Sequence, residues 1–120
     1  MTPKALIIED DATLAMVYAE ALRSADFDTA VIHTGQAAMD YLAVSSPQII
    51  VLDLHLPDVS GIRIVEQVRS LDHLGETRII VTSGDPGLAD TVREQVDLVL
   101  DKPVSTQQLQ LLSSRMRPAD

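Results

Sequence analysis

The sequence predicts an α/β fold in which helices cover both faces of a parallel β-sheet. Short runs of apolar residues alternate along the chain with longer segments of helical periodicity, which is the order expected of consecutive β-α units. The short runs are apolar throughout rather than alternately polar and apolar, which indicates strands buried on both faces of the sheet. We therefore expect five strands and five helices arranged as a three-layer sandwich.

Length and composition limit the classes of function. The 120 residues fit one domain, residues 1–120, and 46% of them are hydrophobic, enough for a single core. The formal net charge of −9 disfavours direct contact with nucleic acid or with an anionic membrane surface. No cysteine is present, which excludes disulfides and zinc–thiolate sites. No apolar run is long enough for membrane insertion and no signal peptide opens the chain, so we expect a cytoplasmic protein.

Five segments are predicted to be strands. Two of the runs are especially rich in β-branched residues, which favour strands over helices. The second segment has the weakest pattern of the five. In chain order the segments are Ala5–Ile8, Thr29–Ile32, Ile49–Leu52, Ile79–Val81 and Leu98–Leu100.

The first helix is predicted to begin after Asp11, because an Asp carboxylate can accept hydrogen bonds from the free N–H groups of a first helical turn. Leu14, Val17, Ala21 and Leu22 then recur at the spacing of one helical face. We expect these four side chains to point toward the core.

The remaining helices are predicted in the same way, from a cap residue and the apolar face that follows it. The fourth, from about Leu88 to Gln95, is short and polar. Ser105 and Gln108 form an S-x-x-Q capping box at the start of the fifth. The caps and inward faces are Thr34 with Ala38, Met39 and Leu42 for Gly35–Val44; Ser60 with Ile64, Val65 and Val68 for the third helix; and Ser105 with Leu109, Leu112 and Met116 for the fifth.

Polar residues follow four of the predicted strands. Open parallel sheets bind ligands beyond the carboxyl ends of the strands, near the point where the strand order reverses. In the flavodoxin-like order 2-1-3-4-5 the first and third strands are neighbours there, so their carboxylates would meet. The residues are Glu9-Asp10-Asp11 after the first strand, Asp53 after the third, Thr82-Ser83-Gly84 after the fourth and Asp101-Lys102-Pro103 after the fifth.

The converging carboxylates cannot all stay ionised without a compensating cation. Oxygen ligands without a cluster of His or Cys favour Mg²⁺, which also accepts a phosphate oxygen as a ligand. Glu9 and Asp10 are candidate metal ligands, whereas Asp11 is better explained as a helix cap. The three histidines are not expected to bind metal, because the spacing of His33, His55 and His73 supports no shared site.

The same edge carries the groups that phosphoryl transfer needs. Lys102 adds a positive charge, Thr82 adds a hydroxyl donor, and backbone N–H groups near Leu54 and Ser83 can donate further hydrogen bonds. Asp53 is the candidate nucleophile, because it stands alone at a strand end and would face the metal.

These residues resemble the receiver domain of two-component response regulators, and the resemblance covers essentially the whole chain. Each element is common by itself, but all of them in order and at suitable separations are specific. The elements are Leu6-Ile7-Ile8-Glu9-Asp10-Asp11, Asp53-x-x-x-Pro57-x-x-x-Gly61, Thr82-Ser83-Gly84, Lys102-Pro103, and the strand–helix order between them.

The resemblance implies that Asp53 accepts a phosphoryl group from a phosphohistidine on a sensor histidine kinase or a histidine phosphotransfer protein. The phosphorylated domain would then change its interaction with a downstream protein target. Asp10 and Asp53 would bind Mg²⁺ directly, together with the backbone carbonyl of His55. Glu9 would act through a metal-bound water.

The resemblance also assigns roles to the residues around the phosphoacceptor. Lys102 would pair with the phosphoryl oxygens, and its peptide bond to Pro103 is usually cis in the family. Thr82 would donate a hydrogen bond to the phosphoryl group and move when that group arrives. Pro57 and Gly61 would shape the loop and the start of the third helix.

Three features depart from the family pattern. Val99 stands three residues before the lysine, where members usually carry Tyr or Phe, so we do not expect an aromatic-gated switch. The segment from Thr82 to Lys102 is slightly short, so we expect an unusual and mobile fourth helix. No output domain follows the fifth helix, which implies a stand-alone receiver or a fragment of a hybrid kinase or larger regulator.

Two other functions are compatible with parts of the pattern. A degenerate receiver would act only as a docking module, independent of phosphorylation, and would not bind Mg²⁺. An Mg²⁺-dependent phosphatase of the haloacid-dehalogenase type also uses an Asp nucleophile at a strand end. That class needs an acid two residues after the nucleophile, where this chain has His55, and 120 residues leave no room for a cap domain.

Overall fold

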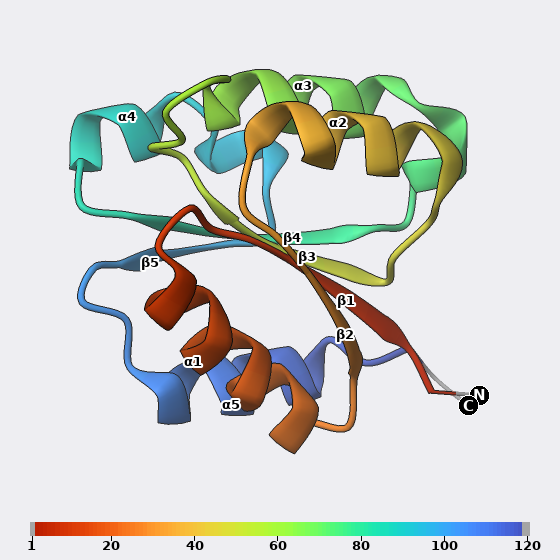
Figure 1. Cartoon of the computed structure of the whole chain (residues 1–120), viewed down its shortest axis with the longest axis vertical. Coiled ribbons are helices and arrows are strands. Elements are labelled where there is room, and N and C mark those ends of the chain that lie inside the picture. Colours follow the sequence, from red (N-terminus) through yellow and green to blue (C-terminus); the bar gives the residue numbers. More distant parts are fainter. Residues whose placement is uncertain (1, 119–120) are drawn as a thin grey trace.

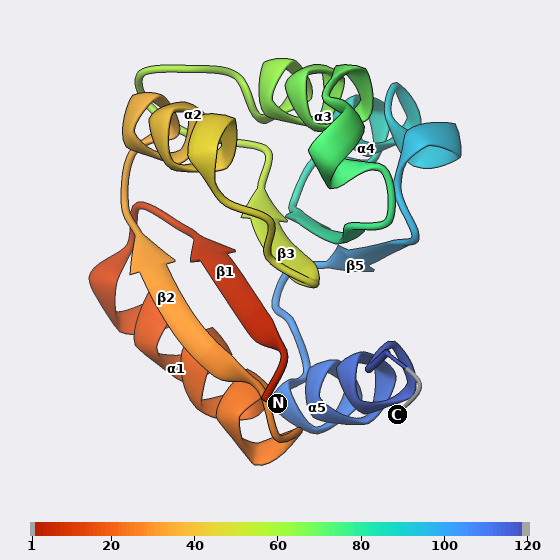
Figure 2. The same ribbon diagram turned by 90° about the vertical axis from the view of Figure 1, so that its right-hand side faces the viewer.

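The computed structural model describes residues 2–118 and contains a five-stranded parallel sheet. The strands lie in the order β2-β1-β3-β4-β5, which confirms the flavodoxin-like order (Figure 2). All five predicted strand segments are strands in the structure, each longer by one to three residues. They are β1 (Lys4–Ile8), β2 (Asp28–Ile32), β3 (Ile49–Asp53), β4 (Arg78–Ser83) and β5 (Leu98–Asp101).

Helices cover both faces of the sheet, so the three-layer sandwich is confirmed. Figure 1 shows α2, α3 and α4 above the sheet and α1 and α5 below it. Short 3-10 turns follow α3 and α4. The helices are α1 (Ala12–Ser24), α2 (Gly35–Val44), α3 (Gly61–Ser70), α4 (Pro86–Asp90) and α5 (Thr106–Arg115), and the turns are η1 (Asp72–Leu74) and η2 (Arg93–Gln95).

The core consists of two aliphatic layers, one on each face of the sheet. Successive residues of β1 show the division, because Leu6 and Ile8 pack with α2 and α3, whereas Ala5 and Ile7 pack with α1 and α5. Every residue of β3 is buried, as expected for a central strand covered on both faces. Burial of each such Leu, Ile or Val side chain contributes roughly 1.5–3 kcal/mol, so the strand that ends in Asp53 is firmly held.

The four predicted N-caps are confirmed. Each cap side chain accepts a hydrogen bond from the backbone N–H of a residue in the first turn of its helix. Ser105 Oγ accepts the Gln108 N–H at 3.2 Å and caps α5. The other pairs are Asp11 with the Leu14 N–H at 3.0 Å, Thr34 with the Ala37 N–H at 3.2 Å and Ser60 with the Ile62 N–H at 3.2 Å.

The prediction for one face of α1 is partly wrong. Val17 is 39% exposed, whereas Tyr18 next to it is 2% exposed and lies in the core. The apolar spacing fits two faces of this helix, since Ala15, Tyr18 and Leu22 also repeat at helical intervals. The face that covers the sheet is the one with the aromatic ring, and Val17 lies at the edge toward α5.

The fourth helix differs from the prediction, which placed it from about Leu88 to Gln95. Helix α4 has only 5 residues and ends at Asp90, and the end of the predicted segment, Arg93–Gln95, forms the separate turn η2. Arg69 of α3 fixes the end of this segment, because its guanidinium donates to the Gln95 carbonyl at 2.7 Å and pairs with Asp97 at 3.4 Å. Within residues 2–118, no helix is both long enough and apolar enough to cross a bilayer.

Candidate functional site

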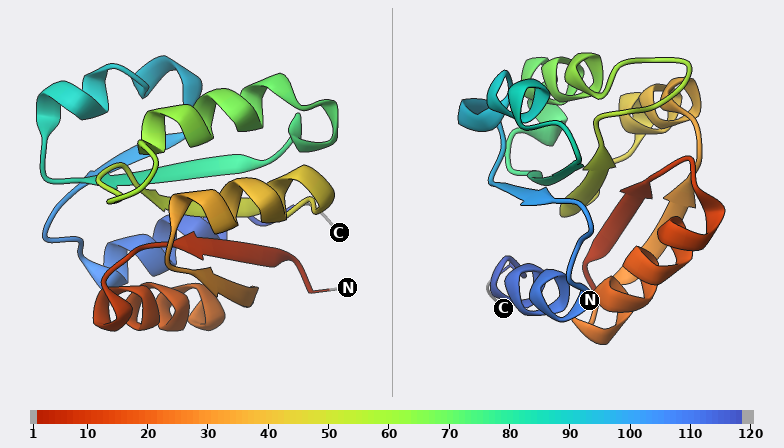
Figure 3. Two further views of the ribbon diagram at one scale, coloured as in Figure 1. Left: turned by 45° about the horizontal axis from the view of Figure 1, so that its top comes forward. Right: turned by 90° about the vertical axis from the view of Figure 1, so that its left-hand side faces the viewer.

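The loops that follow the strands meet at one edge of the sheet. In Figure 1 the loops after β1, β3, β4 and β5 gather at the left of the molecule, and the left view of Figure 3 shows the same cluster. The register brings Asp53 of β3 beside Thr82 of β4, and Ser83 beside Asp101 of β5. The parallel sheet therefore brings together the acidic residues, the hydroxyl and the lysine that the sequence places far apart.

Asp53 lies in a cluster with one cation and a second carboxylate, and we call this cluster the pocket. Its side chain is 3% exposed, and Lys102 Nζ lies 3.4 Å from its Oδ2. The same Nζ lies 3.1 Å from Glu9 Oε1. The other carboxylate oxygen of Asp53, Oδ1, accepts the His55 N–H at 2.9 Å, and this bond orients the carboxylate at the end of β3.

Lys102 remains positively charged in this pocket. Burial alone would lower the pKa of its ammonium, but the hydrogen bond to Glu9 and the charges of Asp53 and Glu9 outweigh burial, so the pKa is raised. A fixed positive charge beside two carboxylates is suited to binding a further anion, provided that the carboxylates are themselves compensated.

Glu9 is the most strongly perturbed acid of the pocket. It is 1% exposed, and its pKa is raised to about 7, chiefly because burial disfavours the charged form and also because the Asp53 charge is close. The Asp11 N–H donates to Glu9 Oε2 at 3.2 Å and, like Lys102, opposes that rise. The pocket therefore holds more negative charge than one lysine balances.

The three acids have the arrangement of a cation site. One carboxylate oxygen each from Glu9, Asp10 and Asp53 lies within 4.8 Å of the other two. Asp10 is exposed at the mouth, while Glu9 and Asp53 are buried. The donors are hard oxygens, and burial together with the nearby Asp53 charge disfavours the charged form of Glu9, which a divalent cation would stabilise, so these residues fit Mg²⁺.

Thr82 offers a hydroxyl without a protein partner. The residue is fully buried, and its Oγ1 forms no hydrogen bond within residues 2–118. A buried hydroxyl with no partner has an energetic cost, which a ligand oxygen at this position would remove. Because Thr82 pairs with Asp53 across the β3–β4 ladder, that ligand would lie beside the Asp53 carboxylate.

One of the backbone N–H groups at this edge of the sheet serves the strand pairing, and the Ser83 side chain serves the next loop. The Leu54 N–H donates to the Thr82 carbonyl at 3.3 Å, so it extends the β3–β4 pairing. The Ser83 side chain faces the next loop, where its Oγ accepts the Asp85 N–H at 3.0 Å and contacts the Asp85 carbonyl at 3.1 Å. Ser83 therefore shapes the start of α4.

The loop after Asp53 is shaped by close packing. His55 and Pro57 are exposed, and His55 Nε2 lies 3.9 Å from Asp85 Oδ2 across the mouth of the pocket. Gly61 is buried and begins α3 directly against the strand end. A Cβ at position 61 would lie 2.6 Å from the Leu54 Cα, so only glycine allows this approach.

The end of β5 carries Val99, and Lys102 and Pro103 follow it. The Lys102–Pro103 peptide bond is cis. Val99 is partly buried and packs against the core layer under α2, α3 and α4. The position three residues before Lys102, for which the resemblance leads us to expect an aromatic ring, is thus occupied by a short aliphatic side chain.

Two residues near the pocket were missed by the sequence reasoning. Tyr18 is buried near the charges of Lys102 and Glu9, burial raises the pKa of its phenol, and it shares a hollow of about 420 Å³ with Lys102 and Pro103. Asp58, in the loop after β3, accepts the Gly35 N–H at 2.9 Å. No local pattern could have revealed the Asp58 contact, because the partners are 23 positions apart.

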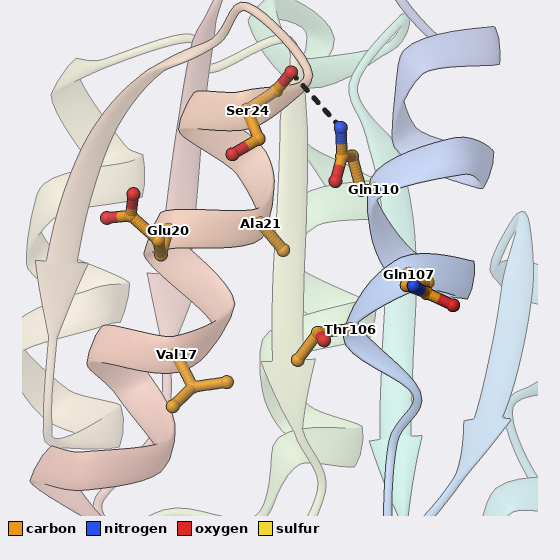
Figure 4. A pocket seen from close by; sticks show the side chains of 7 residues that line it. All are labelled: Val17, Glu20, Ala21, Ser24, Thr106, Gln107 and Gln110. Atoms are coloured by element: carbon orange, nitrogen blue, oxygen red, sulfur yellow. Dashed lines mark hydrogen bonds between the residues drawn. The ribbon is translucent and has the colours of Figure 1, made fainter.

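A second hollow lies on the lower layer, between α1 and α5. This groove has a volume of about 250 Å³. Figure 4 shows Val17 and Ala21 on one wall and Thr106 on the other. Gln110 Nε2 donates to the Ser24 carbonyl at 3.4 Å across one end. No acid of the cation site lines the groove, so it is separate from the pocket around Asp53.

We expect Glu9→Gln to stabilise the metal-free protein at pH 8. Because the folded pKa of about 7 exceeds the ordinary 4.5, the stability from this group is fully present at low pH and is lost as the pH rises through 7. Glutamine removes that loss, so the free energy of unfolding should rise by roughly 1–3 kcal/mol at pH 8 and by less at pH 5. Urea denaturation in the presence of EDTA measures the free energy of unfolding at both pH values. The control is Glu20→Gln, an exposed acid paired with Arg23, and identical pH profiles for the two variants would contradict the expectation.

Fold and site together define a class of protein, an open α/β sheet with a cluster of three acids and a lysine at its carboxyl edge. The chain belongs to the response regulator receiver domain family, whose model matches residues 5–113. This match confirms the resemblance predicted from the sequence. It also makes the chain a signalling module of two-component phosphorelay systems.

The curated relatives are response regulators. The chain is 34% identical over 90 residues to the cell cycle response regulator CtrA of Brucella ovis, covering 75% of this chain and 38% of that protein. It is 37% identical over 70 residues to the DNA-binding response regulator MtrA of Mycobacterium tuberculosis, covering 58% of this chain and 31% of that protein. The chain thus spans about a third of the length of these relatives.

A solved structure agrees over nearly the whole fold. The CheY-like response regulator receiver domain from Methylobacillus flagellatus is 26% identical, with a TM-score of 0.86. The match covers 98% of this chain and 100% of that chain. The predicted architecture is confirmed at the level of the complete sandwich.

Proposed function

We propose that this receiver domain is a switch that accepts a phosphoryl group on Asp53 from a phosphohistidine of a sensor histidine kinase or histidine phosphotransfer protein. The observation that carries the proposal is the position of Asp53. It is buried at a strand end, between the Lys102 ammonium and the carboxylates of Glu9 and Asp10. We propose that the whole chain, residues 1–120, forms this one receiver domain. Its phosphorylation would change the interaction with a downstream protein target.

In the proposed step, a carboxylate oxygen of Asp53 attacks the phosphorus of the phosphohistidine. A P–O bond forms, the P–N bond breaks, and the imidazole leaves with the electron pair and takes up a proton. The chain's own residues supply this catalysis, so the donor contributes only the phosphoryl group.

Lys102 and Thr82 are proposed to hold the transferred group. The Lys102 ammonium already lies 3.4 Å from Asp53 Oδ2, so it is in place to pair with a phosphoryl oxygen as negative charge arrives. Thr82 Oγ1, which has no partner in the described chain, would donate a hydrogen bond to another oxygen.

Mg²⁺ is the cofactor that fits the acidic residues. Glu9, Asp10 and Asp53 would hold it, together with the main-chain carbonyl of His55. When bound, the ion neutralises the carboxylates and withdraws charge from the phosphoryl oxygens. Lys102 Nζ and Glu9 Oε1 lie 3.1 Å apart, and this ion pair holds the ammonium beside Asp53.

The test is the intact mass of the protein after incubation with acetyl phosphate, with and without Mg²⁺. We expect one added phosphoryl group that depends on Mg²⁺. Absence of an adduct together with absence of Mg²⁺ binding, measured by calorimetry, would contradict the proposal. That result would favour the alternative, a docking module, for which Val99 and the 5-residue α4 are the supporting observations.

A further inference from the structure

The loop of residues 54–60 joins Asp53 to α3 and also touches α2. At the start of the loop the His55 N–H donates to Asp53 Oδ1 at 2.9 Å. Farther along, Asp58 accepts the N–H groups of Gly35 and Gln36 at the start of α2. We propose that Asp58 couples the state of the Asp53 carboxylate to helix α2. As a route for phosphorylation-dependent change, this coupling rests on the proposed function.

Asp58 caps α2 from a different part of the chain. Its Oδ1 accepts the Gly35 N–H at 2.9 Å and its Oδ2 accepts the Gln36 N–H at 3.0 Å, so both oxygens are used. These two bonds lower the pKa of Asp58, the one from Gln36 having the larger effect, and the carboxylate therefore stays ionised. The cap from Thr34 serves the next N–H, that of Ala37. The first turn of α2 thus depends on the loop for two of its free donors.

Close packing leaves little slack between the loop and α2. Gly35 is buried, and a Cβ at this position would lie 2.7 Å from the Val59 Cβ. Asp58 and Val59 therefore contact α2 through hydrogen bonds and through van der Waals contact at the same point. A shift of the loop cannot be absorbed by a gap and must displace the start of α2 or break the two hydrogen bonds.

Residues after the loop hold α2 along the rest of its length. Gln67 Nε2 of α3 donates to the Met39 carbonyl at 3.0 Å, and His73 Nε2 of η1 lies 2.8 Å from the Leu42 carbonyl. One continuous segment, residues 58–73, thus contacts α2 at its start, middle and end. Helices α2 and α3 are tied to each other and to the loop that begins at Asp53.

Phosphorylation of Asp53 changes the hydrogen bond between the His55 N–H and Asp53 Oδ1, where the loop begins. An acyl phosphate turns one carboxylate oxygen into a bridging oxygen, and the other becomes a carbonyl oxygen without a full charge. The His55 N–H then loses a charge-assisted acceptor or shifts to a phosphoryl oxygen. Either change moves the loop relative to β3, and Asp58 transmits the movement to Gly35 and Gln36.

A double-mutant cycle tests the coupling without any phosphoryl group. The amide resonances of Gly35 and Gln36 are followed by NMR in ¹⁵N-labelled full chain for Asp53→Ala, Asp58→Ala and the double variant. We expect Asp53→Ala to shift both resonances when Asp58 is present and to leave them unchanged when Asp58 is alanine. Amide exchange at Gly35 and Gln36 should be roughly tenfold or more faster in Asp58→Ala, because a charged acceptor is lost.

The matched control is Asp40→Ala. Asp40 is an exposed acid on α2 whose Oδ1 accepts the Gln36 side-chain amide at 3.0 Å, and within residues 2–118 it forms no hydrogen bond or ion pair with the loop. With Asp40→Ala in place of Asp58→Ala, the response of Gly35 and Gln36 to Asp53→Ala should remain. Asp58→Asn, which keeps the side chain's size and one acceptor oxygen, should give a partial loss.

Equal shifts at Gly35 and Gln36 with and without Asp58, or no shift in either background, would overturn the coupling. Adding Mg²⁺ and acetyl phosphate to the wild-type sample should shift the same two resonances. The intact mass of that sample reports separately whether the phosphoryl adduct forms. Failure of the proposed function is thereby read from the mass, and failure of the coupling from the double-mutant cycle.

Discussion

Asp53→Asn should gain no phosphoryl group from acetyl phosphate, whatever the Mg²⁺ concentration. Asparagine keeps the shape of the side chain but replaces the nucleophilic oxygen pair with an amide, whose nitrogen lone pair is delocalised. It also removes one charge from the carboxylates that lie within 4.8 Å of one another, so Mg²⁺ binding should weaken. Intact-mass spectrometry of the variant and the wild type under the same conditions measures the difference.

The control for Asp53→Asn is Asp101→Asn. Asp101 ends β5 at the same edge of the sheet, but it is exposed and does not belong to the cluster of Glu9, Asp10 and Asp53. Its substitution removes the same charge without touching Asp53, so labelling should persist. Labelling of Asp53→Asn at the wild-type level would mean that another residue accepts the phosphoryl group.

Gly61→Ala should destabilise the fold by roughly 1–3 kcal/mol, the usual cost of overpacking a tight contact. The added Cβ would lie 2.6 Å from the Leu54 Cα and 3.0 Å from the Asp53 carbonyl oxygen, and both atoms belong to the backbone. The strain falls on the strand end that orients the phosphoacceptor. Relief of the strain would have to move Asp53 or the first turn of α3. Urea denaturation measures the free energy of unfolding.

Gly84→Ala is the matched control for Gly61→Ala. Gly84 lies in the loop after β4, and a Cβ there would meet no atom of the described chain within 4 Å. Its free energy of unfolding should stay within about 0.5 kcal/mol of the wild type, as for an ordinary surface substitution. Equal losses in the two variants would show that the close approach at Gly61 is not the cause.

The elements of the fold could be predicted because their signals are local. A run such as Ile49–Leu52 is apolar enough to require burial on both faces, and caps such as Thr34 and Ser60 mark helix starts by their own hydroxyl chemistry. Val17 was assigned to the wrong side of α1, because the sequence does not say which of two apolar faces meets the sheet. That choice depends on the packing of Tyr18 and of α5.

The site could be predicted only in part, for a related reason. The carboxyl ends of parallel strands share one edge, so Glu9, Asp53 and Lys102 could be placed together from strand order alone. The role of Asp58 in capping α2 depends on a contact between two loops that no periodicity encodes. Which backbone N–H near Leu54 reaches the site also depends on the folded loop, since the Leu54 N–H serves the sheet and the His55 N–H donates to Asp53.

The most direct test of the central claim is to locate the phosphoryl group on the chain. Protein labelled with acetyl phosphate and Mg²⁺ is reduced with borohydride, which converts an aspartyl phosphate to homoserine, and its peptides are sequenced by mass spectrometry. We predict homoserine at position 53, in peptides from samples that contained Mg²⁺. Homoserine at Asp10, or an unmodified Asp53 in protein whose intact mass shows the adduct, would contradict the claim that Asp53 is the phosphoacceptor.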